Sequence, residues 1–203
     1  KCLEDESYRF ISGDSAIYIR SEDREAGVYT VSCDRGSWET IWFPFFDLER
    51  CYSEIAVSES GKHEFVDKAI DHGRGVRLLR QDPWEMLLTF IISQRKSIPA
   101  IIKSVEALSE KYGHDIVTEQ ERLKAFPSPE EMKDATAEEL AACGLGYRVK
   151  YILDAIQKVN SGELNLQAIA ELPDHALLEK LQAVMGVGIK VANCIALFAY
   201  GRT

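Results

Sequence analysis

The sequence lacks the features that mark membrane, secreted and metal-cluster proteins. It has no apolar run of the roughly 18 residues that span a bilayer, and its first residues are too acidic for a signal peptide. Its five cysteines are widely spread and include no C-x-x-C pair, which indicates free thiols and argues against a metal or iron–sulfur site. We therefore expect an intracellular, cytoplasmic protein.

Repeats and low-complexity segments are absent, and 46% apolar with 28% charged residues is typical of a globular protein. The net charge of −9 argues against a nucleic-acid partner, but the charge is unevenly distributed. Residues 74–113 carry seven basic and four acidic side chains, and residues 147–158 carry three and one. These two segments either face nucleic acid or form solvated helix faces.

Two kinds of secondary structure follow one another along the chain. Aromatic and β-branched runs predict antiparallel strands near 8–11, 16–19 and 27–32, and from Asp47 onward apolar residues recur at helical spacing. We expect an α+β protein with a β-sheet domain over 1–60 and a helical domain over 61–203. The predicted helices are 47–57, 63–73, 82–94, 98–112, 129–134, 136–143, 147–160, 165–171, 174–184 and 190–200.

The most informative segment, residues 173–200, predicts two helices joined by a tight hairpin at Gly186-Val187-Gly188. Two glycines let the backbone turn sharply and approach a partner closely. The free N–H groups and the positive dipole end of the second helix would then bind a phosphate. The alternative is a helix-turn-helix in which the glycines only allow tight packing.

Lys190 lies in the first turn of the second helix, where the helix dipole opposes its positive charge. This position favours the neutral, nucleophilic amine, which can attack a sugar C1′ and form a Schiff base. The alternative is a surface lysine that holds a phosphate.

Residues 185–194 resemble the helix-hairpin-helix of the HhH-GPD DNA glycosylases, and lysine at position 190 marks their bifunctional branch. Residues 75–83 and 144–148 are similar to segments of the 8-oxoguanine DNA glycosylase/AP lyase family, bacterial type. The resemblance runs from about residue 42 to the end. It implies a TBP-like N-terminal sheet domain, a helical glycosylase domain with its helix-hairpin-helix at 174–200, and a damaged double-stranded DNA substrate.

The resemblance also implies roles for individual residues. Lys190 would be the Schiff-base nucleophile, and Cys194, one helical turn later, would face the extruded base; a small core thiol is the alternative. Tyr147 and Arg148 would contact the orphaned partner base, or else form an ordinary helix start. The remaining residues expected to contact DNA are Gln94, Arg95, Lys96, Gly186, Val187 and Gly188.

The hairpin carbonyls of Gln182, Val184 and Val187 match family positions that can hold K⁺ or Na⁺, and no other cofactor is expected. Three departures concern specificity and the turn. Arg95 and Lys96 replace asparagines, and Ala100 replaces an arginine that checks for cytosine, so we expect weaker discrimination of the opposite base. Met185 replaces the usual hairpin proline.

The resemblance places the partner aspartate of Lys190 beyond Thr203 and an earlier strand before Lys1, so we expect the natural protein to be longer at both ends. A chain limited to these residues would bind DNA with little or no base excision.

From these observations we predict a DNA glycosylase that removes 8-oxoguanine and cleaves the strand through Lys190, acting as a nucleoid-associated monomer. Two alternatives stay open. One is an alkylpurine glycosylase of the 3-methyladenine type without lyase activity. The other is a non-catalytic helix-hairpin-helix protein, whose affinity for DNA would depend on salt and not on damage.

Overall fold

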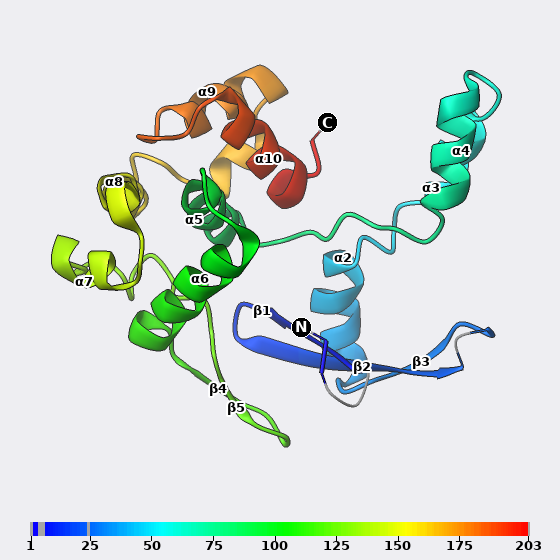
Figure 1. Cartoon of the computed structure of the whole chain (residues 1–203), viewed down its shortest axis with the longest axis horizontal. Helices are drawn as coiled ribbons and strands as arrows, with labels where there is room; N and C mark the ends of the chain where they lie inside the picture. Colours follow the sequence, from blue (N-terminus) through cyan, green and yellow to red (C-terminus); the bar gives the residue numbers. More distant parts are fainter. Residues whose placement is uncertain (1, 4–6, 24, 203) are drawn as a thin grey trace. The chain divides into compact units, whose positions relative to one another are not determined.

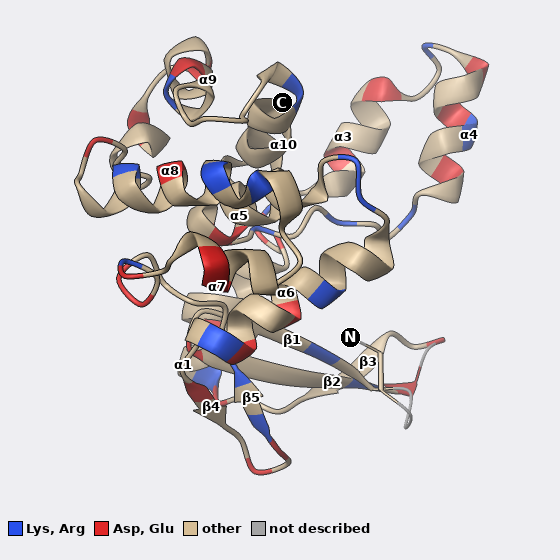
Figure 2. Ribbon diagram, turned by 60° about the vertical axis from the view of Figure 1, so that its left-hand side comes forward, with Lys and Arg blue, Asp and Glu red and all other residues tan. Residues whose placement is uncertain are grey.

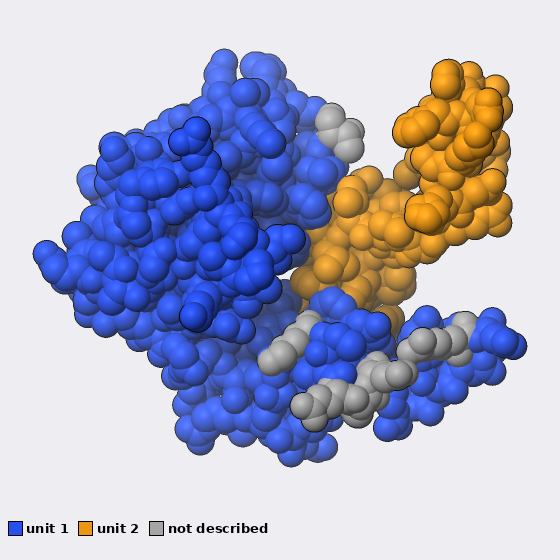
Figure 3. Space-filling model, viewed as in Figure 1, with its two compact units in different colours: residues 1–32, 81–203 blue, residues 33–80 orange. Residues whose placement is uncertain are grey.

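The computed structural model describes residues 2–3, 7–23 and 25–202. The chain divides into two compact units, one formed by residues 1–32 and 81–203 and the other by residues 33–80 (Figure 3). The predicted domain boundary at residue 60 stays a prediction, since these units group the chain differently.

The first unit begins with the predicted antiparallel sheet, which has the order β1-β2-β3 (Figure 1). The strands are β1 (Tyr8–Ser12), β2 (Ser15–Asp23) and β3 (Val28–Val31). Ser12 pairs with Ser15 across a two-residue turn in which Gly13 has a φ of 53°, a conformation that favours glycine. Ile17 and Tyr18 of β2 are both buried, and because successive side chains of a strand point to opposite faces, both faces of the strand are covered at this position.

A second small sheet, absent from the sequence prediction, is formed by β4 (Asp115–Val117) and β5 (Arg122–Lys124). Ile116 and Leu123 are buried there, and Ile11 and Ala16 of the first sheet pack against this cluster. The hydroxyl of Tyr18 adds a 2.9 Å hydrogen bond to the carboxylate of Glu121. The β4–β5 hairpin therefore joins the N-terminal sheet to the helical part of its unit.

The helical part consists of α5 (Pro83–Ser93), α6 (Ile98–Tyr112), α7 (Ala137–Ala142), η2 (Gly146–Arg148), α8 (Val149–Asn160), η3 (Ala168–Glu171), α9 (Asp174–Gln182) and α10 (Ile189–Tyr200). The side chains of Leu87, Leu88, Ile91 and Ile92 on α5 are fully buried in the core. Asp82 caps α5 by accepting the Glu85 N–H, as the Asp-Pro start predicts. The predicted helix over 129–134 is wrong, because this segment forms consecutive turns.

The second unit contains α1 (Arg35–Ser37), η1 (Trp38–Trp42), α2 (Phe43–Phe45), α3 (Tyr52–Glu59) and α4 (Glu64–His72). A helix beginning at Asp47 is a wrong prediction. Asp47 has a φ of 51° and ends the helical run instead. Its buried carboxylate accepts from Tyr52 at 2.8 Å and from Arg80 at 3.2 Å, while Arg77 donates to its carbonyl at 2.6 Å. Residues 75–80 thus contribute to the packing of this unit.

The fold class is confirmed as an antiparallel sheet followed by a mostly helical domain. The described cysteines are free thiols, as expected. In the described part of the chain, no helix is long and apolar enough to cross a membrane.

Candidate active site

The hairpin between α9 and α10 needs a glycine at one of its two predicted positions. Gly186 has a φ of 85°, and a Cβ built on it would lie 2.5 to 3.0 Å from atoms of the Tyr151 ring. Both facts exclude a larger residue. Gly188 has a φ of −87°, and a Cβ there would meet nothing within 4 Å. Gly188 is therefore open to an approaching partner.

Helix α10 begins at Ile189, and no side chain caps it. The Val187 N–H is used inside the hairpin, where it donates to the Val184 carbonyl at 3.0 Å. The N–H groups of the first turn have no partner within the helix and can bind an anion there. Lys190 is the second residue of this helix, and its side chain is exposed.

A cavity of about 720 Å³ opens beside Lys190. It brings together five of the ten residues predicted to act on DNA. Its walls are Phe90, Ser93, Gln94, Arg95, Tyr147, Tyr151, Lys190, Val191 and Cys194. Cys194 lies one helical turn after Lys190 and is half-buried, so both side chains of α10 face the same space.

The turn between α5 and α6 contributes Gln94 and Arg95. The Gln94 side chain donates to the Gly186 carbonyl at 3.0 Å, which ties this turn to the hairpin. Arg95 has a φ of 50° and an exposed side chain. A non-glycine residue in this conformation is uncommon and occurs often at functional sites.

Lys96 and Arg148 lie next to the cavity but do not line it. The Arg148 side chain is 6% exposed, and its guanidinium donates to the carbonyls of Gln94 and Leu145 and covers the Tyr147 ring at 4.4 Å. The Lys96 ammonium donates to the Ser104 hydroxyl and, at 2.8 Å, to the Gly144 carbonyl. Burial and the nearby Arg148 charge lower the pKa of Lys96. Contacts of these two side chains with DNA stay predictions, since each would have to leave its present partners.

Sequence reasoning missed Tyr151, whose ring lies against Gly186 and meets the Tyr147 ring edge-on at 6.0 Å. The signal was present, because Tyr147 and Tyr151 are four residues apart at the start of the helix predicted over 147–160. It also missed Phe90, which lines the cavity and stacks on Phe198 at 5.7 Å.

The carbonyls predicted to hold a monovalent cation lie at the end of α9 and in the hairpin. Neutral main-chain oxygens suit such an ion. The 3.0 Å bond from the Val187 N–H to the Val184 carbonyl shows that two of the three residues share one tight turn. Because the Val184 carbonyl already accepts this N–H, a cation at these three carbonyls stays a prediction. Among the described residues, no group of three His, Cys, Asp or Glu side chains could hold a metal ion.

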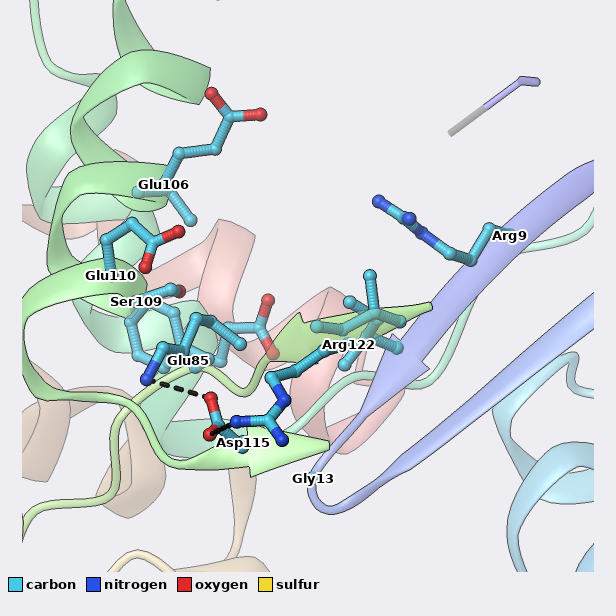
Figure 4. A pocket seen from close by; sticks show the side chains of 13 residues that line it. Arg9, Gly13, Glu85, Glu106, Ser109, Glu110, Asp115 and Arg122 are labelled. Carbon is cyan, nitrogen blue, oxygen red and sulfur yellow. Dashed lines mark hydrogen bonds and ion pairs between the residues drawn. The ribbon is translucent and has the colours of Figure 1, made fainter. Parts of the chain in front are cut away.

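A second cavity, of about 690 Å³, lies between β1, α6 and the β4–β5 hairpin (Figure 4). Glu106 and Glu110 reach into it from α6, and Arg9 reaches into it from β1. Asp115 pairs there with Arg122 and Lys124, both at 3.0 Å; Figure 2 shows basic segments on β5 and acidic segments at the tip of this hairpin. Burial, with the nearby Asp82 charge, raises the pKa of Glu85 to about 7. None of the residues predicted to act on DNA lines this cavity.

Two family models match the chain. The model of the 8-oxoguanine DNA glycosylase N-terminal domain matches residues 1–87. The model of HhH-GPD superfamily base excision DNA repair proteins matches residues 88–198, more than half of the chain. The chain belongs to the HhH-GPD superfamily, within its 8-oxoguanine glycosylase family. The resemblance seen in the sequence is thereby confirmed.

Relatives of this family cover most of the chain. N-glycosylase/DNA lyase OGG1 of Arabidopsis thaliana is 33% identical over 194 residues, which are 92% of this chain and 53% of that protein. The N-glycosylase/DNA lyase of Saccharomyces cerevisiae is 34% identical over 136 residues, 61% of this chain and 36% of that protein. The chain thus spans about half the length, or less, of these two curated relatives.

Several solved structures share this fold. MBOgg1 in complex with a low-affinity DNA ligand has a TM-score of 0.93 and 37% identity, covering 100% of this chain and 69% of that one. A second structure is the 8-oxoguanine glycosylase/lyase of Clostridium acetobutylicum in complex with double-stranded DNA containing cytosine opposite 8-oxoguanine. It has a TM-score of 0.91 and 34% identity, and the match covers 99% of this chain and 68% of that one. A 3-methyladenine DNA glycosylase of Archaeoglobus fulgidus, 18% identical with a TM-score of 0.74 over 97% of this chain and 68% of that one, shares the fold alone.

Proposed function

We propose that the protein to which this chain belongs removes 8-oxoguanine from duplex DNA and then cleaves the strand as an AP lyase. One observation carries the proposal: Lys190 stands exposed at an uncapped helix N-terminus, in a cavity that it shares with Cys194. The names of the relatives, N-glycosylase/DNA lyase and 8-oxoguanine glycosylase/lyase, support the same reaction.

In the first step, the damaged nucleotide rotates out of the DNA duplex and into the cavity. The free amine of Lys190 attacks C1′, the bond from C1′ to the base breaks, and the base leaves with a proton. Opening of the sugar ring at O4′ converts the C1′ adduct into an imine. Loss of a C2′ proton then expels the 3′ phosphate oxygen and breaks the strand. Formation of the C1′ adduct explains why a lysine, and not only an activated water, belongs at this position.

The residues around Lys190 take the roles that their positions allow. Cys194 would face the extruded base, and Tyr147 with the exposed Arg95 would contact the duplex where the base has left. The open Gly188 and the first-turn N–H groups of α10 would hold a phosphate. A monovalent cation on the hairpin carbonyls would add positive charge beside that phosphate. Monomeric action at a nucleoid-associated, cytoplasmic site stays a prediction.

An excision assay tests the function. Protein of natural length would be mixed in excess with duplexes that carry one 8-oxoguanine opposite cytosine, one alkylated purine, or no damage. Strand breaks that form without alkali report lyase activity, and breaks that appear only after hot alkali report base release alone. We expect 8-oxoguanine release with strand breaks before alkali. Release from the alkylated duplex alone, without direct breaks, would favour the 3-methyladenine type, and equal binding of all three duplexes without release would favour a non-catalytic binder.

A further inference from the structure

Three side chains of α8 reach the hairpin that precedes Lys190. Tyr151, Asp154 and Lys158 follow one another at spacings of three and four residues, so they lie on one face of the helix. The Tyr151 ring lies under Gly186. The other two side chains bind the chain just before that glycine, which makes this face of α8 a support for the hairpin.

The contacts of Asp154 and Lys158 are polar and specific. Asp154 Oδ2 accepts the Met185 N–H at 2.7 Å. Lys158 Nζ donates to the same carboxylate at 3.0 and 3.1 Å and to the Ala183 carbonyl at 2.8 Å. The Lys158 side chain is only 18% exposed and the Asp154 side chain 19%, so water screens this ion pair less than it screens a pair on the surface.

Each contact gives a hydrogen-bond partner to a backbone group of the hairpin. Ala183 follows the last turn of α9, where carbonyl groups lack partners in the helix and a lysine charge is favourable. The Met185 N–H lies outside both helices, and a charge-assisted bond to a carboxylate is among the stronger ways to hold it. A pair that only stabilised α8 would need neither contact, and these contacts reach across 25 and 31 residues of sequence.

The hairpin is thus fixed from two sides. Asp154 and Lys158 hold Ala183 and Met185, and Gln94 holds the next residue, Gly186, through its carbonyl. Helix α10 begins three residues later, with Lys190 as its second residue. A shift of the hairpin would therefore move both the first-turn N–H groups and the Lys190 amine.

We propose that Asp154 and Lys158 are positioning residues. They hold the hairpin in place, and through it they set the distance between the Lys190 amine and the C1′ atom that it attacks. This proposal rests on the proposed function for its kinetic part. Its structural part, that the pair holds the Met185 N–H in the free protein, stands without that function.

The test compares the natural-length wild type with Asp154→Ala, Asp154→Asn and Lys158→Met. Single-turnover rates are measured at saturating duplex with 8-oxoguanine opposite cytosine, together with the Kd for a duplex that carries a tetrahydrofuran abasic analogue. We expect Asp154→Ala to slow the single-turnover rate about tenfold or more, because small misplacements of reacting groups are costly. Asp154→Asn keeps an oxygen acceptor for the Met185 N–H and should recover part of the loss.

A matched control comes from Glu64 and Lys68, which form an i,i+4 pair at 2.6 Å on α4 with both side chains exposed. Glu64→Ala and Lys68→Met should leave the rate and the Kd unchanged. The melting temperature of every variant shows whether it is folded, and rates are compared only at temperatures well below each melting point. Unchanged rate and Kd in folded Asp154→Ala would overturn the kinetic part of the proposal.

Hydrogen exchange at the Met185 amide gives a readout without activity. In Asp154→Ala this amide should exchange at least tenfold faster, while amides inside α9 and α10 keep their wild-type rates. Unchanged exchange at Met185 would overturn the structural part. If the wild type cleaves no damaged duplex, the proposed function fails, yet the exchange result still decides whether the pair holds the hairpin.

Discussion

The side-chain amide of Gln94 donates a 3.0 Å hydrogen bond to the carbonyl oxygen of Gly186, which joins the turn after α5 to the hairpin before α10. These residues are 92 positions apart in sequence, and Gln94 lines the Lys190 cavity. The bond links two loops that are both expected to contact DNA. Its removal should therefore affect DNA binding more than folding.

Gln94→Ala tests this link. A single hydrogen bond contributes about 1 kcal/mol, so we expect a small loss of stability and roughly fivefold weaker binding to an abasic-analogue duplex. Fluorescence anisotropy titration measures the affinity. Gln157→Ala is the control, because Gln157 is exposed on α8 and should bind as the wild type does. Equal affinities for both variants would contradict the predicted role.

The two hairpin glycines should respond differently to alanine. Gly186→Ala forces a φ of 85° on a residue with a Cβ and drives that atom into the Tyr151 ring, so we expect a loss of about 2 kcal/mol or more in the free energy of unfolding. Gly188→Ala meets neither obstacle and should change it by less than about 0.5 kcal/mol. Urea denaturation measures both. Equal losses would contradict the different conformations and surroundings of Gly186 and Gly188.

Glu85 should make the stability depend on pH. Its pKa is raised from 4.5 to about 7, so the folded state binds the proton more tightly than the unfolded chain does. The resulting stabilisation is present at low pH and is lost as the pH rises from about 4.5 through about 7. Glu85→Gln lacks this loss, and above pH 8 it should be more stable than the wild type by on the order of 2 kcal/mol. Unfolding curves at pH 5 and pH 8.5 check this; a difference that does not change with pH would contradict it.

His114 should also make the protein less stable as the pH rises, by a smaller amount than Glu85 does. Its ring contacts Glu131 and Asp14, both at 2.9 Å, and the hydrogen bond to Glu131 is the main cause of its raised pKa. A raised pKa of a histidine gives stability that is present below 6.5 and lost as the pH rises through the folded value. The ring is 43% exposed, so solvent screening limits the effect to below about 1 kcal/mol. His114→Gln should be less stable than the wild type at pH 6 and equal to it at pH 9 in thermal melts.

The sequence predicted the parts of the site that lie on one element. Lys190 and Cys194 are one helical turn apart, so the helix alone decides that they share a face. The position of Arg148 was beyond such reasoning, because its burial depends on carbonyls of Gln94 and Leu145 in two different loops. The contact of Tyr151 with Gly186 depends in the same way on how α8 packs against the hairpin.

Fold prediction was limited by short elements. The three-residue strands β4 and β5 are too short to show an alternating pattern, and the loop between them carries Glu119 and Glu121. The helical run from Arg35 was hidden by its aromatic residues and by Pro44, which favour other structures in isolation. Long helices such as α6, with an apolar face along 15 residues, gave a clear signal.

Borohydride trapping tests the central claim most directly. Protein of natural length would be mixed with a duplex that carries 8-oxoguanine opposite cytosine, reduced with borohydride, and digested to locate the linked peptide by mass spectrometry. The account predicts a covalent protein–DNA band attached at Lys190, absent in Lys190→Gln and retained in Lys180→Gln, a control at an exposed position of α9. A band that persists in Lys190→Gln, or a linkage at another residue, would contradict it.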